Sequence, residues 1–552
     1  MPSFLVDLLM LGEPGTEAAR GSNNWVVAGD HTTTGAPLLA NDPHLDFQMP
    51  SLWYVAHLQG ERLHVTGPTF PGLPGIPIGH NEHLAWGLTN VGPDVQDLVI
   101  ERFDPDDPLR VEYAGAFEPV TVRDEVIRVK GGKDVELRVR ETRHGPIVTE
   151  YYDGVGEEVA LRWTALADDD STVMAFSELA YASTVDEGLE AMRNYVAPAQ
   201  NIVLADRDGH IGWLAAGRYP LRSDGGDGNL PVPGWDGAHE WSGWLPFEEW
   251  PRAVDPERGW FATANARTVG PDYPHYLGDD FSAPYRTQRI VDRLSAEVPL
   301  DGAEMAAIQR DVVSLLAVEL LPTLRGAADR AGLSVVVDGW EGSMDADSAA
   351  AALFHAWLIH LPGALVEGEL GEHADKARGL NSSLMHRCFV AGGCSFCGDG
   401  ADLTCDETAD LALVRARELL GERLGPDPAD WRWGDLHDSV FHHRLGSVPG
   451  LGGLLDRTVH VGGSPFTVAA AFYSSRRPFE TRFGVSYRQV LDLSDWDASR
   501  MMHTTGQSGH PASPHYDDLL PRWSGGQLIP MPFSPEAVDE VVRDRMVLVP
   551  AP

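Results

Sequence analysis

The chain has 552 residues, enough for three or four average domains or for one large domain with insertions. Hydrophobic residues make up 43% and aromatic residues 9%, which excludes a wholly disordered chain. Asp and Glu number 82 against 42 Lys and Arg, and the net charge of −40 excludes electrostatic attraction to nucleic acid or anionic membranes. Because no run of about 18 apolar residues occurs, we expect no membrane insertion.

The first 21 residues predict a short lead peptide. They lack a basic region and Asp7 interrupts their apolar stretch, so they make a poor signal peptide. From residue 22, short apolar runs bounded by Gly, Asn, Asp and Pro indicate strands. Alternating apolar and charged residues over 119–141 predict a half-exposed hairpin.

The middle of the chain has a different periodicity. Apolar residues recur at helical spacing over 300–318, 349–361 and 407–424, and short strand patterns return after residue 426. We therefore predict one α/β body with a mostly helical insert. The predicted boundaries are 1–21 for the lead, 22–296 for the first part of the body, 297–425 for the insert and 426–552 for the second part of the body.

All four cysteines lie in one segment, at positions 388, 394, 397 and 405. This spacing favours one or two disulfides that close a surface loop. Free thiols are an alternative. A four-cysteine zinc site is weaker, because structural zinc usually uses two short cysteine pairs and only Cys394 and Cys397 have that spacing.

Several familiar catalytic motifs are absent from the sequence. No serine lies in G-x-S-x-G, which weakens an α/β-hydrolase interpretation. H-E-x-x-H, the P-loop pattern and a Rossmann glycine motif are also missing. The 21 His are scattered, and His386, His442 and His443 lack partners at metal-ligand spacing. A metal-dependent hydrolase built from scattered His and Asp is therefore a weaker alternative.

A set of sequence blocks carries more information than any single motif. The blocks include Gly-Ser-Asn-Asn-Trp at 21–25, Leu-Leu-Ala-Asn-Asp-Pro-His-Leu at 38–45, Gly-His-Asn-Glu-His-Leu-Ala-Trp-Gly-Leu-Thr-Asn at 79–90, Ala-Pro-Ala-Gln-Asn at 197–201 and Gly-Gln-Ser-Gly-His at 506–510. Taken alone, Gly-Ser-Asn-Asn is an ordinary turn. Together the blocks resemble the penicillin-acylase family of N-terminal-nucleophile amide hydrolases, which includes acylases of penicillins, cephalosporins and acyl-homoserine lactones.

The resemblance implies an α+β fold, the four-layer αββα sandwich, and an autocatalytic cut between Gly21 and Ser22. The Ser22 hydroxyl would attack the Gly21 carbonyl, and the cut would free the α-amine of Ser22. A serine hydroxyl needs an adjacent base. A free α-amine, with a pKa of about 7.7–8.0, suits that role and would take the proton through one water. The implied reaction is hydrolysis of linear non-peptide amides, such as penicillins or acyl-homoserine lactones, through an acyl-Ser22 intermediate.

The same resemblance implies the other catalytic residues. The backbone N–H of Asn90 or Val91 and the side-chain amide of Asn265 are expected to bind the oxyanion. His44 is expected to hydrogen-bond the α-amine and tune its pKa, and Arg286 to order the substrate site. Structural roles are the alternatives: a strand-end turn for Asn265, a buried imidazole for His44 and a surface salt bridge for Arg286.

By position, Leu45, Ile78 and Leu88 are expected to line the acyl pocket. Aliphatic walls suit an apolar acyl chain. Penicillin G acylases carry aromatic residues at two of these places, so we do not expect a preference for phenylacetyl groups here.

The resemblance also implies a structural calcium site. Asp94, Gln96 and Asp97 match the family's calcium loop, and the carbonyl of Pro220 would be a further oxygen ligand. The Glu that the family supplies from its other chain segment is missing from this sequence. A solvated acidic loop is the alternative, and no organic cofactor is expected.

Two departures from the family pattern bear on activity. Family precursors carry a long α segment before the serine, whereas 21 residues precede Ser22 here. We therefore expect either a truncated reading frame or a separate α chain as a partner. The segment 462–469 also departs from the family pattern, at Ser464 and Ala469. The alternative to an acylase is an inactive family member or binding module that lacks its α segment. The family is usually periplasmic or secreted, but this chain offers no signal from which to predict its location.

Overall fold

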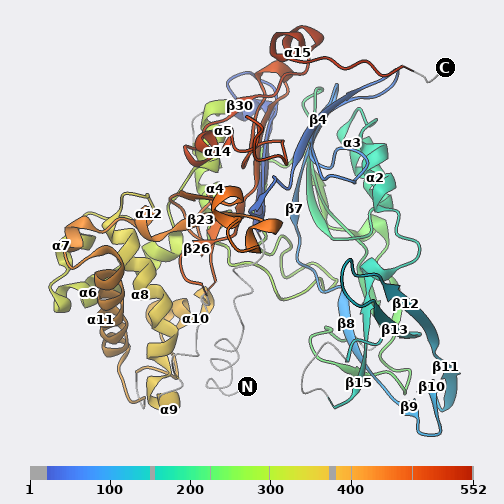
Figure 1. Ribbon diagram of the computed structural model, residues 1–552, viewed down its shortest axis with the longest axis horizontal. Coiled ribbons are helices and arrows are strands. Elements are labelled where there is room, and N and C mark those ends of the chain that lie inside the picture. Colours follow the sequence, from blue (N-terminus) through green and yellow to red (C-terminus); the bar gives the residue numbers. More distant parts are fainter. Residues whose placement is uncertain are drawn as a thin grey trace.

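The computed structural model describes residues 21–149, 156–223, 225–296, 299–371, 374, 381–398, 401–474 and 477–549. Two large β-sheets face each other in the middle of the molecule, and a group of helices lies to one side of them (Figure 1). Strand-rich and helix-rich stretches follow one another along the chain. The predicted α+β class is therefore confirmed.

The first sheet has eight strands, and β1 lies inside it between β22 and β2. The order continues through β28, β29 and β30, while β27 joins β2 and β25 pairs with β27. The strands are β1 (Gly21–Val27), β2 (Leu38–Asp46), β22 (Trp260–Thr263), β25 (Ala471–Phe472), β27 (Phe483–Val485), β28 (Tyr487–Asp492), β29 (Arg500–His503) and β30 (Ile529–Pro530).

The second sheet has seven strands in the order β21, β17, β16, β7, β6, β5 and β4. Its strands are β4 (Tyr54–Gln59), β5 (His64–Thr69), β6 (Gly79–Asn81), β7 (Leu84–Asn90), β16 (Gln200–Asp206), β17 (Ile211–Ala216) and β21 (Arg252–Val254). Val26 and Leu39 of the first sheet pack against Ala85, Val203 and Ile211 of the second. This shared apolar core holds the two sheets face to face.

Helices cover the outer face of each sheet. On the first sheet, Trp25 and Ala40 pack against Ile290 of α4 (Tyr285–Leu294) and Ile308 of α5 (Gly302–Gln309). On the second sheet, the outward residues of β7 and β16 pack against α2 (Thr172–Leu179) and α3 (Val185–Ala191). The layers therefore follow the order helix, sheet, sheet, helix.

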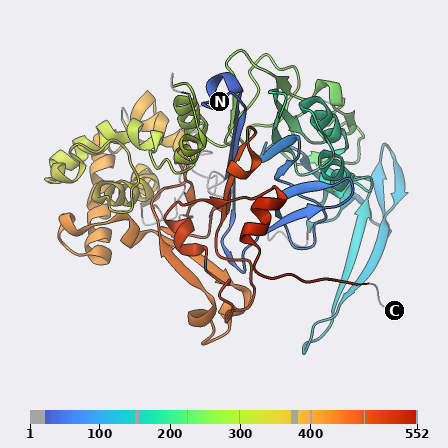
Figure 2. The same cartoon turned by 90° about the horizontal axis from the view of Figure 1, so that it is seen from above.

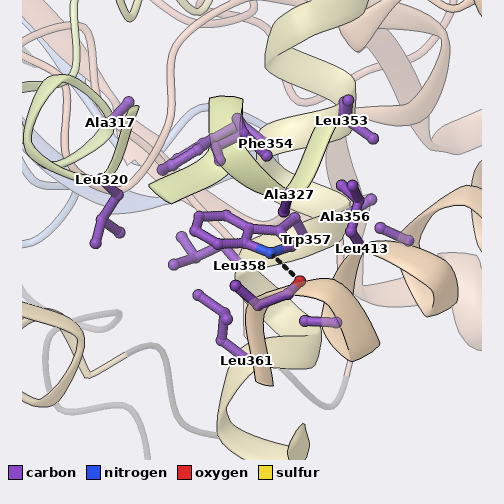
Figure 3. Packing of buried hydrophobic residues seen from close by; sticks show 14 of the residues in the cluster. Ala317, Leu320, Ala327, Leu353, Phe354, Ala356, Trp357, Leu358, Leu361 and Leu413 are labelled. Atoms are coloured by element: carbon purple, nitrogen blue, oxygen red, sulfur yellow. Dashed lines mark hydrogen bonds between the residues drawn. The ribbon is translucent and has the colours of Figure 1, made fainter. Parts of the chain in front are cut away.

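A separate apolar core holds the helical group. Trp357 lies at its centre, where its indole Nε1 donates to the carbonyl of Ala409 at 3.0 Å and Leu361 and Leu413 pack nearby (Figure 3). The helices are α6 (Leu315–Ala331), α7 (Ser334–Val337), α8 (Ala349–Leu365), α9 (Glu367–Leu370), α10 (Ser382–His386), α11 (Cys405–Leu424) and α12 (Trp433–Leu436). The predicted helices at 349–361 and 407–424 are confirmed as α8 and α11.

Two disulfides close short loops beside this core. Cys388 pairs with Cys394, and Cys397 pairs with Cys405 at the first residue of α11. The predicted disulfides are therefore confirmed. All four sulfur atoms are in disulfides, so none is a thiolate that could bind zinc. None of the described helices is long and apolar enough to cross a membrane.

The single helix predicted at 300–318 is wrong, because the structure divides this stretch into α5 and α6. Between them, the carboxylate of Asp311 accepts hydrogen bonds from the side chain of Arg289 and from the backbone N–H of Val313. The side chain of Ser314 then caps the start of α6. Side chains that bond nearby backbone N–H groups favour caps and turns over helix interiors, and helical periodicity alone does not reveal that competition.

Smaller sheets and helices complete the molecule. The hairpin predicted at 119–141 is confirmed and lies on the far side of the sheets from the helical group (Figure 2). The remaining elements are β3 (Gln48–Met49), β8 (Gln96–Glu101), β9 (Phe103–Asp104), β10 (Asp107–Tyr113), β11 (Ala116–Pro119), β12 (Thr121–Ile127), β13 (Val135–Thr142), β14 (Gly145–Pro146), β15 (Glu158–Trp163), β18 (Pro220–Arg222), β19 (Val232–Pro233), β20 (Trp241–Trp244), β23 (Asp438–His443), β24 (Arg457–His460), β26 (Glu480–Thr481), α13 (Gly452–Leu455), α14 (Leu520–Ser524) and α15 (Pro535–Val541).

A buried histidine in this fold makes stability depend on pH. The imidazole of His437 stacks on Trp433 with ring centroids 4.3 Å apart. Its Nδ1 donates to the Val461 carbonyl, and its Nε2 accepts from the Thr481 hydroxyl. Burial lowers the pKa of His437 from 6.5 to about 4. Between pH 6.5 and about 4, His437 therefore binds a proton in the unfolded chain but not in the folded chain, and the fold loses stability as the pH falls.

We expect the unfolding free energy of His437→Gln to fall less steeply with decreasing pH than that of the wild type. In the wild type, this one group should remove about 1.4 kcal/mol of unfolding free energy per pH unit as the pH falls below 6.5. Urea unfolding at several pH values between 7 and 4 measures the slope, with His510→Gln, an exposed histidine, as the matched control. Equal slopes for His437→Gln and wild type would contradict the prediction.

Candidate active site

The pairing of β1 with β2 sets the positions of the candidate catalytic residues. These antiparallel strands place Gly21 opposite His44 and Asn23 opposite Asp42. Side chains alternate between the two faces of a strand. In register with the core residues described above, Ser22 lies on the face next to the second sheet, whereas Asn23, Asp42 and His44 lie on the face that carries α4 and α5.

Ser22 is held at its hydroxyl and at its backbone N–H. Its hydroxyl donates to the carbonyl oxygen of Gly21 at 2.5 Å, and its backbone N–H donates to Oδ1 of Asn265 at 2.8 Å. The side chain is buried, with 7% exposure. This N–H is the group that a cut between residues 21 and 22 would convert to an α-amine.

Asn265 connects Ser22 to the second sheet. It follows β22 in a left-handed conformation with φ of 67°, which Asn tolerates better than most residues. While its Oδ1 accepts from Ser22, its Nδ2 donates to the carbonyl of Asn90, the last residue of β7, at 2.9 Å. One side chain therefore joins the predicted nucleophile to the predicted oxyanion strand.

Arg286 enters the site from the first turn of α4. Its Nη1 donates to the Ser22 carbonyl at 3.1 Å and to Oδ1 of Asn23 at 2.9 Å, and its Nη2 donates to Oδ1 of Asn265 at 3.0 Å. Burial lowers the pKa of Arg286 to about 10, so the guanidinium stays charged at neutral pH. With 3% exposure it does not form a surface salt bridge, which was the structural alternative.

His44 belongs to a buried polar cluster behind Ser22. Its Nε2 lies 2.8 Å from Oδ2 of Asp42, and the same oxygen accepts from Nδ2 of Asn23 at 2.8 Å. Burial lowers the pKa of His44 well below its usual range, and the guanidiniums of Arg286 and Arg488 act in the same direction. Burial raises the pKa of Asp42, although the two guanidiniums oppose this. His44 is therefore a neutral imidazole at neutral pH.

Gly21 fits against this cluster with no space for a side chain. A Cβ at this position would lie 2.6 Å from Nδ1 of His44 and 2.7 Å from the ring of Phe472. Among the residues that the structure describes, none hydrogen-bonds the same Nδ1. The contact explains physically why glycine precedes the serine.

The oxyanion donors that the sequence predicts are already bonded in this structure. The backbone N–H of Val91 donates to the carbonyl of Ala199 at 3.1 Å, and the Asn265 amide donates to Asn90 as described. Both donors therefore lie at the end of β7, and an oxyanion would compete with two carbonyl oxygens for them.

The predicted pocket residues come together in one apolar cluster. Ile78 and Leu88 are buried in the cluster that also contains Val91, and Leu45 is partly buried against it. Leu45 follows His44 on β2 and so lies on the same sheet face as Ser22. Leu88, however, lies on the face of β7 that carries α2 and α3, whereas Ala85 faces the first sheet, so an acyl pocket shared by these residues and Ser22 stays a prediction.

The predicted calcium ligands lie where β8 and β18 begin. Gln96 is the first residue of β8 and Pro220 is the first residue of β18. Arg222, at the other end of β18, donates to both carboxylate oxygens of Asp97, with the shortest contact at 2.6 Å, and lies 3.5 Å from Asp94. A guanidinium thus already faces the two acids, an arrangement that fits a bound cation poorly. Calcium at this loop stays a prediction.

Several polar residues of the site were quoted in the sequence blocks without a role. Asn23 and Asp42 link His44 to Arg286, and the carbonyl of Val468 accepts from Nδ2 of Asn23 at 2.9 Å. This contact connects the site to the segment 462–469, which departs from the family pattern in sequence. The sequence offers one signal for these roles: a polar residue in a strand that is buried on both faces needs a hydrogen-bond partner.

The arrangement of two facing sheets with the serine on an inner strand defines a known structural class. The solved structure of a thermostable penicillin G acylase from Alcaligenes faecalis matches 96% of this chain and 100% of that chain, with a TM-score of 0.75 and 19% identity. At that identity the likeness establishes the fold, which is that of the N-terminal-nucleophile hydrolases.

Sequence comparisons are more specific. The Penicillin amidase family model matches residues 4–540. Penicillin acylase 2 proenzyme from Pseudomonas sp. strain SE83 is 35% identical over 98% of this chain and 71% of that protein. Acyl-homoserine lactone acylase QuiP from Pseudomonas aeruginosa is 31% identical over 96% of this chain and 69% of that protein. The chain belongs to the penicillin amidase family, and the resemblance noted in its sequence is confirmed.

We expect Asn23→Ala to lower the unfolding free energy by about 2 kcal/mol or more, because it leaves buried partners on Arg286, Asp42 and Val468 unsatisfied. Urea denaturation measures the loss. Asn194→Ala, which removes one exposed hydrogen bond to Glu178, is the matched control. A loss equal to that of the control would show that the cluster does not depend on Asn23.

Proposed function

We propose that this chain is an acylase that hydrolyses linear amides through an ester on Ser22, after cutting itself between Gly21 and Ser22. The observation that carries the proposal is the double hold on Ser22. Its hydroxyl donates a hydrogen bond to the carbonyl of the bond to be cut. The N–H that would become the α-amine donates to Oδ1 of Asn265. The family relationship supports the same reaction class, since the named relatives are amide hydrolases.

Arg286 prepares the α-amine to act as a base. It donates to the same Oδ1 of Asn265 that holds the nitrogen of Ser22. A nearby cation disfavours the protonated amine and so lowers its pKa from the usual value of about 7.7–8.0. More of the amine is then free at neutral pH to take the hydroxyl proton, through one water, as Ser22 attacks the substrate carbonyl.

The end of β7 supplies the oxyanion donors in this proposal. The N–H of Val91 and Nδ2 of Asn265 would bond the substrate oxygen as it gains negative charge, in place of or beside their present carbonyl partners. The tetrahedral intermediate then collapses, the leaving amine takes the proton, and the acyl group remains on Ser22 until water hydrolyses the ester.

The substrates that we propose are amides with an apolar acyl chain. The aliphatic cluster of Leu45, Ile78 and Leu88 supports this choice. Two relatives are named as a penicillin acylase and an acyl-homoserine lactone acylase, so β-lactam and acyl-homoserine lactone amides are the first compounds to screen. Because the chain covers 71% and 69% of these relatives, a separate α segment as a partner remains part of the proposal.

Intact mass of the purified protein tests the cut directly. We expect the wild type to lose the mass of residues 1–21, and Ser22→Ala to keep it, because the alanine has no hydroxyl to attack the Gly21 carbonyl. If both proteins stay uncut, the test is repeated with the upstream coding region expressed alongside. A wild-type chain that remains uncut there too would favour an inactive family member or binding module.

We expect Gly21→Ala to slow the cut at least tenfold. The added Cβ overlaps His44 and Phe472 and must displace the carbonyl that Ser22 attacks, and misplaced reacting groups lose rate steeply. The measurement is the time course of cleavage after refolding, followed by mass. Gly60→Ala is the control, since a Cβ at Gly60 meets nothing within 4 Å. Equal rates for Gly21→Ala and wild type would remove the proposed reason for glycine at this position.

A further inference from the structure

We propose that the side chain of Arg222 takes the place of a calcium ion at the loop 94–97, so that this loop is held by an internal ion pair and needs no metal. The proposal concerns a site away from Ser22 and does not depend on the proposed reaction. It departs from the calcium that the family resemblance implies.

The contacts of Asp97 carry the argument. Arg222 donates to Asp97 from Nη2 at 2.6 Å and from Nε at 3.1 and 3.2 Å, and the indole Nε1 of Trp241 donates to Oδ2 at 2.6 Å. Both carboxylate oxygens are therefore engaged by N–H donors. The side chains are buried, with 8% exposure for Arg222 and 7% for Asp97. A dication placed among them would also meet an unscreened positive charge within a few ångströms.

On the side of Gly228, protein atoms pack closely against Arg222 and the two acids. Gly228 lies against the cluster in a left-handed conformation, and a Cβ there would overlap Arg222, Asp97 and Asp94. Calcium takes six to eight oxygen ligands. Among the residues that the structure describes, the only group of three or more His, Cys, Asp or Glu at metal-binding distance consists of cysteines already in disulfides. Within the described parts of the chain, no third carboxylate lies close enough to Asp94 and Asp97 to complete such a group, although the charge of Asp227 is near enough to raise the pKa of Asp94.

The ion pair also connects distant segments. Arg222 ends β18 and Trp241 begins β20, two strands that pair with each other, while Asp97 lies on β8. The loop between β7 and β8 starts at Val91, so its far end is fixed to the paired strands β18 and β20. A cavity of about 350 Å³, lined by Asn90, Asp94 and Gly228 among others, lies beside this loop. Arg222 is therefore a positioning residue, which does for the loop what a bound cation would do.

The test compares the wild type, Arg222→Gln and the control Arg162→Gln. Arg162 is another partly buried arginine in an ion pair, with Glu240 at 2.6 Å. Metal content is read by mass spectrometry, and melting temperature is read in EDTA and in calcium chloride. We expect no stoichiometric calcium in the wild type and the same melting temperature in both solutions. Arg222→Gln should melt several degrees lower in EDTA and recover in calcium, because removing the guanidinium leaves two acids without a cation.

Calcium should not rescue Arg162→Gln, whose acid partner keeps a contact with His144. One calcium per wild-type chain, with a lower melting temperature in EDTA, would overturn the proposal. An Arg222→Gln protein as stable in EDTA as the wild type would also overturn it. If Arg222→Gln does not fold, the calcium content and EDTA response of the wild type decide the question by themselves.

Discussion

The burial of one positive charge, on Arg286, is the constraint on which the candidate site depends. A guanidinium removed from water must find acceptors for its N–H groups or the fold loses several kcal/mol. Here the acceptors are the Ser22 carbonyl and the side-chain oxygens of Asn23 and Asn265. Each of them belongs to, or directly touches, the group that would do the chemistry. The cost of burying the charge therefore selects one geometry for the nucleophile, and the site is organised before any substrate arrives.

The two faces of the β1–β2 pair carry different parts of the candidate site. One face carries Ser22 and Leu45 toward the second sheet, where substrate would bind. The other face carries Asn23, Asp42 and His44, which are fully buried and bond one another. His44 therefore lies on the opposite face from the serine hydroxyl and packs against Gly21. From this position, His44 is better placed to influence the cut after Gly21 and the α-amine of Ser22 than to contact a substrate.

Sequence predicts the parts of this molecule that depend on short patterns and misses those that depend on distant partners. The helices α8 and α11 follow from apolar periodicity, and the family follows from ordered blocks. The break between α5 and α6 does not, because Asp311 ends the first helix through arginines on α4. Likewise Asn23 and Asp42 stood in the quoted blocks, but their roles depend on Arg286, more than two hundred residues away. Arg222 was missed because an acidic loop suggests a metal unless the partner of each acid is known.

The segment from Asn90 to Asp97 connects these two arginine-based arrangements. At one end, the Asn265 amide holds the carbonyl of Asn90, and Asn265 itself is held by Arg286. At the other end, Arg222 holds Asp97. Val91, which carries the predicted oxyanion N–H, lies one residue from the first of these attachments. A loop fixed at both ends has little freedom to move that N–H, so the position of the N–H depends on the paired strands β18 and β20 as well as on the sheet that carries Ser22. If Arg222 replaces a metal ion as proposed, side-chain charges alone fix that position, and it does not depend on the concentration of a free ion.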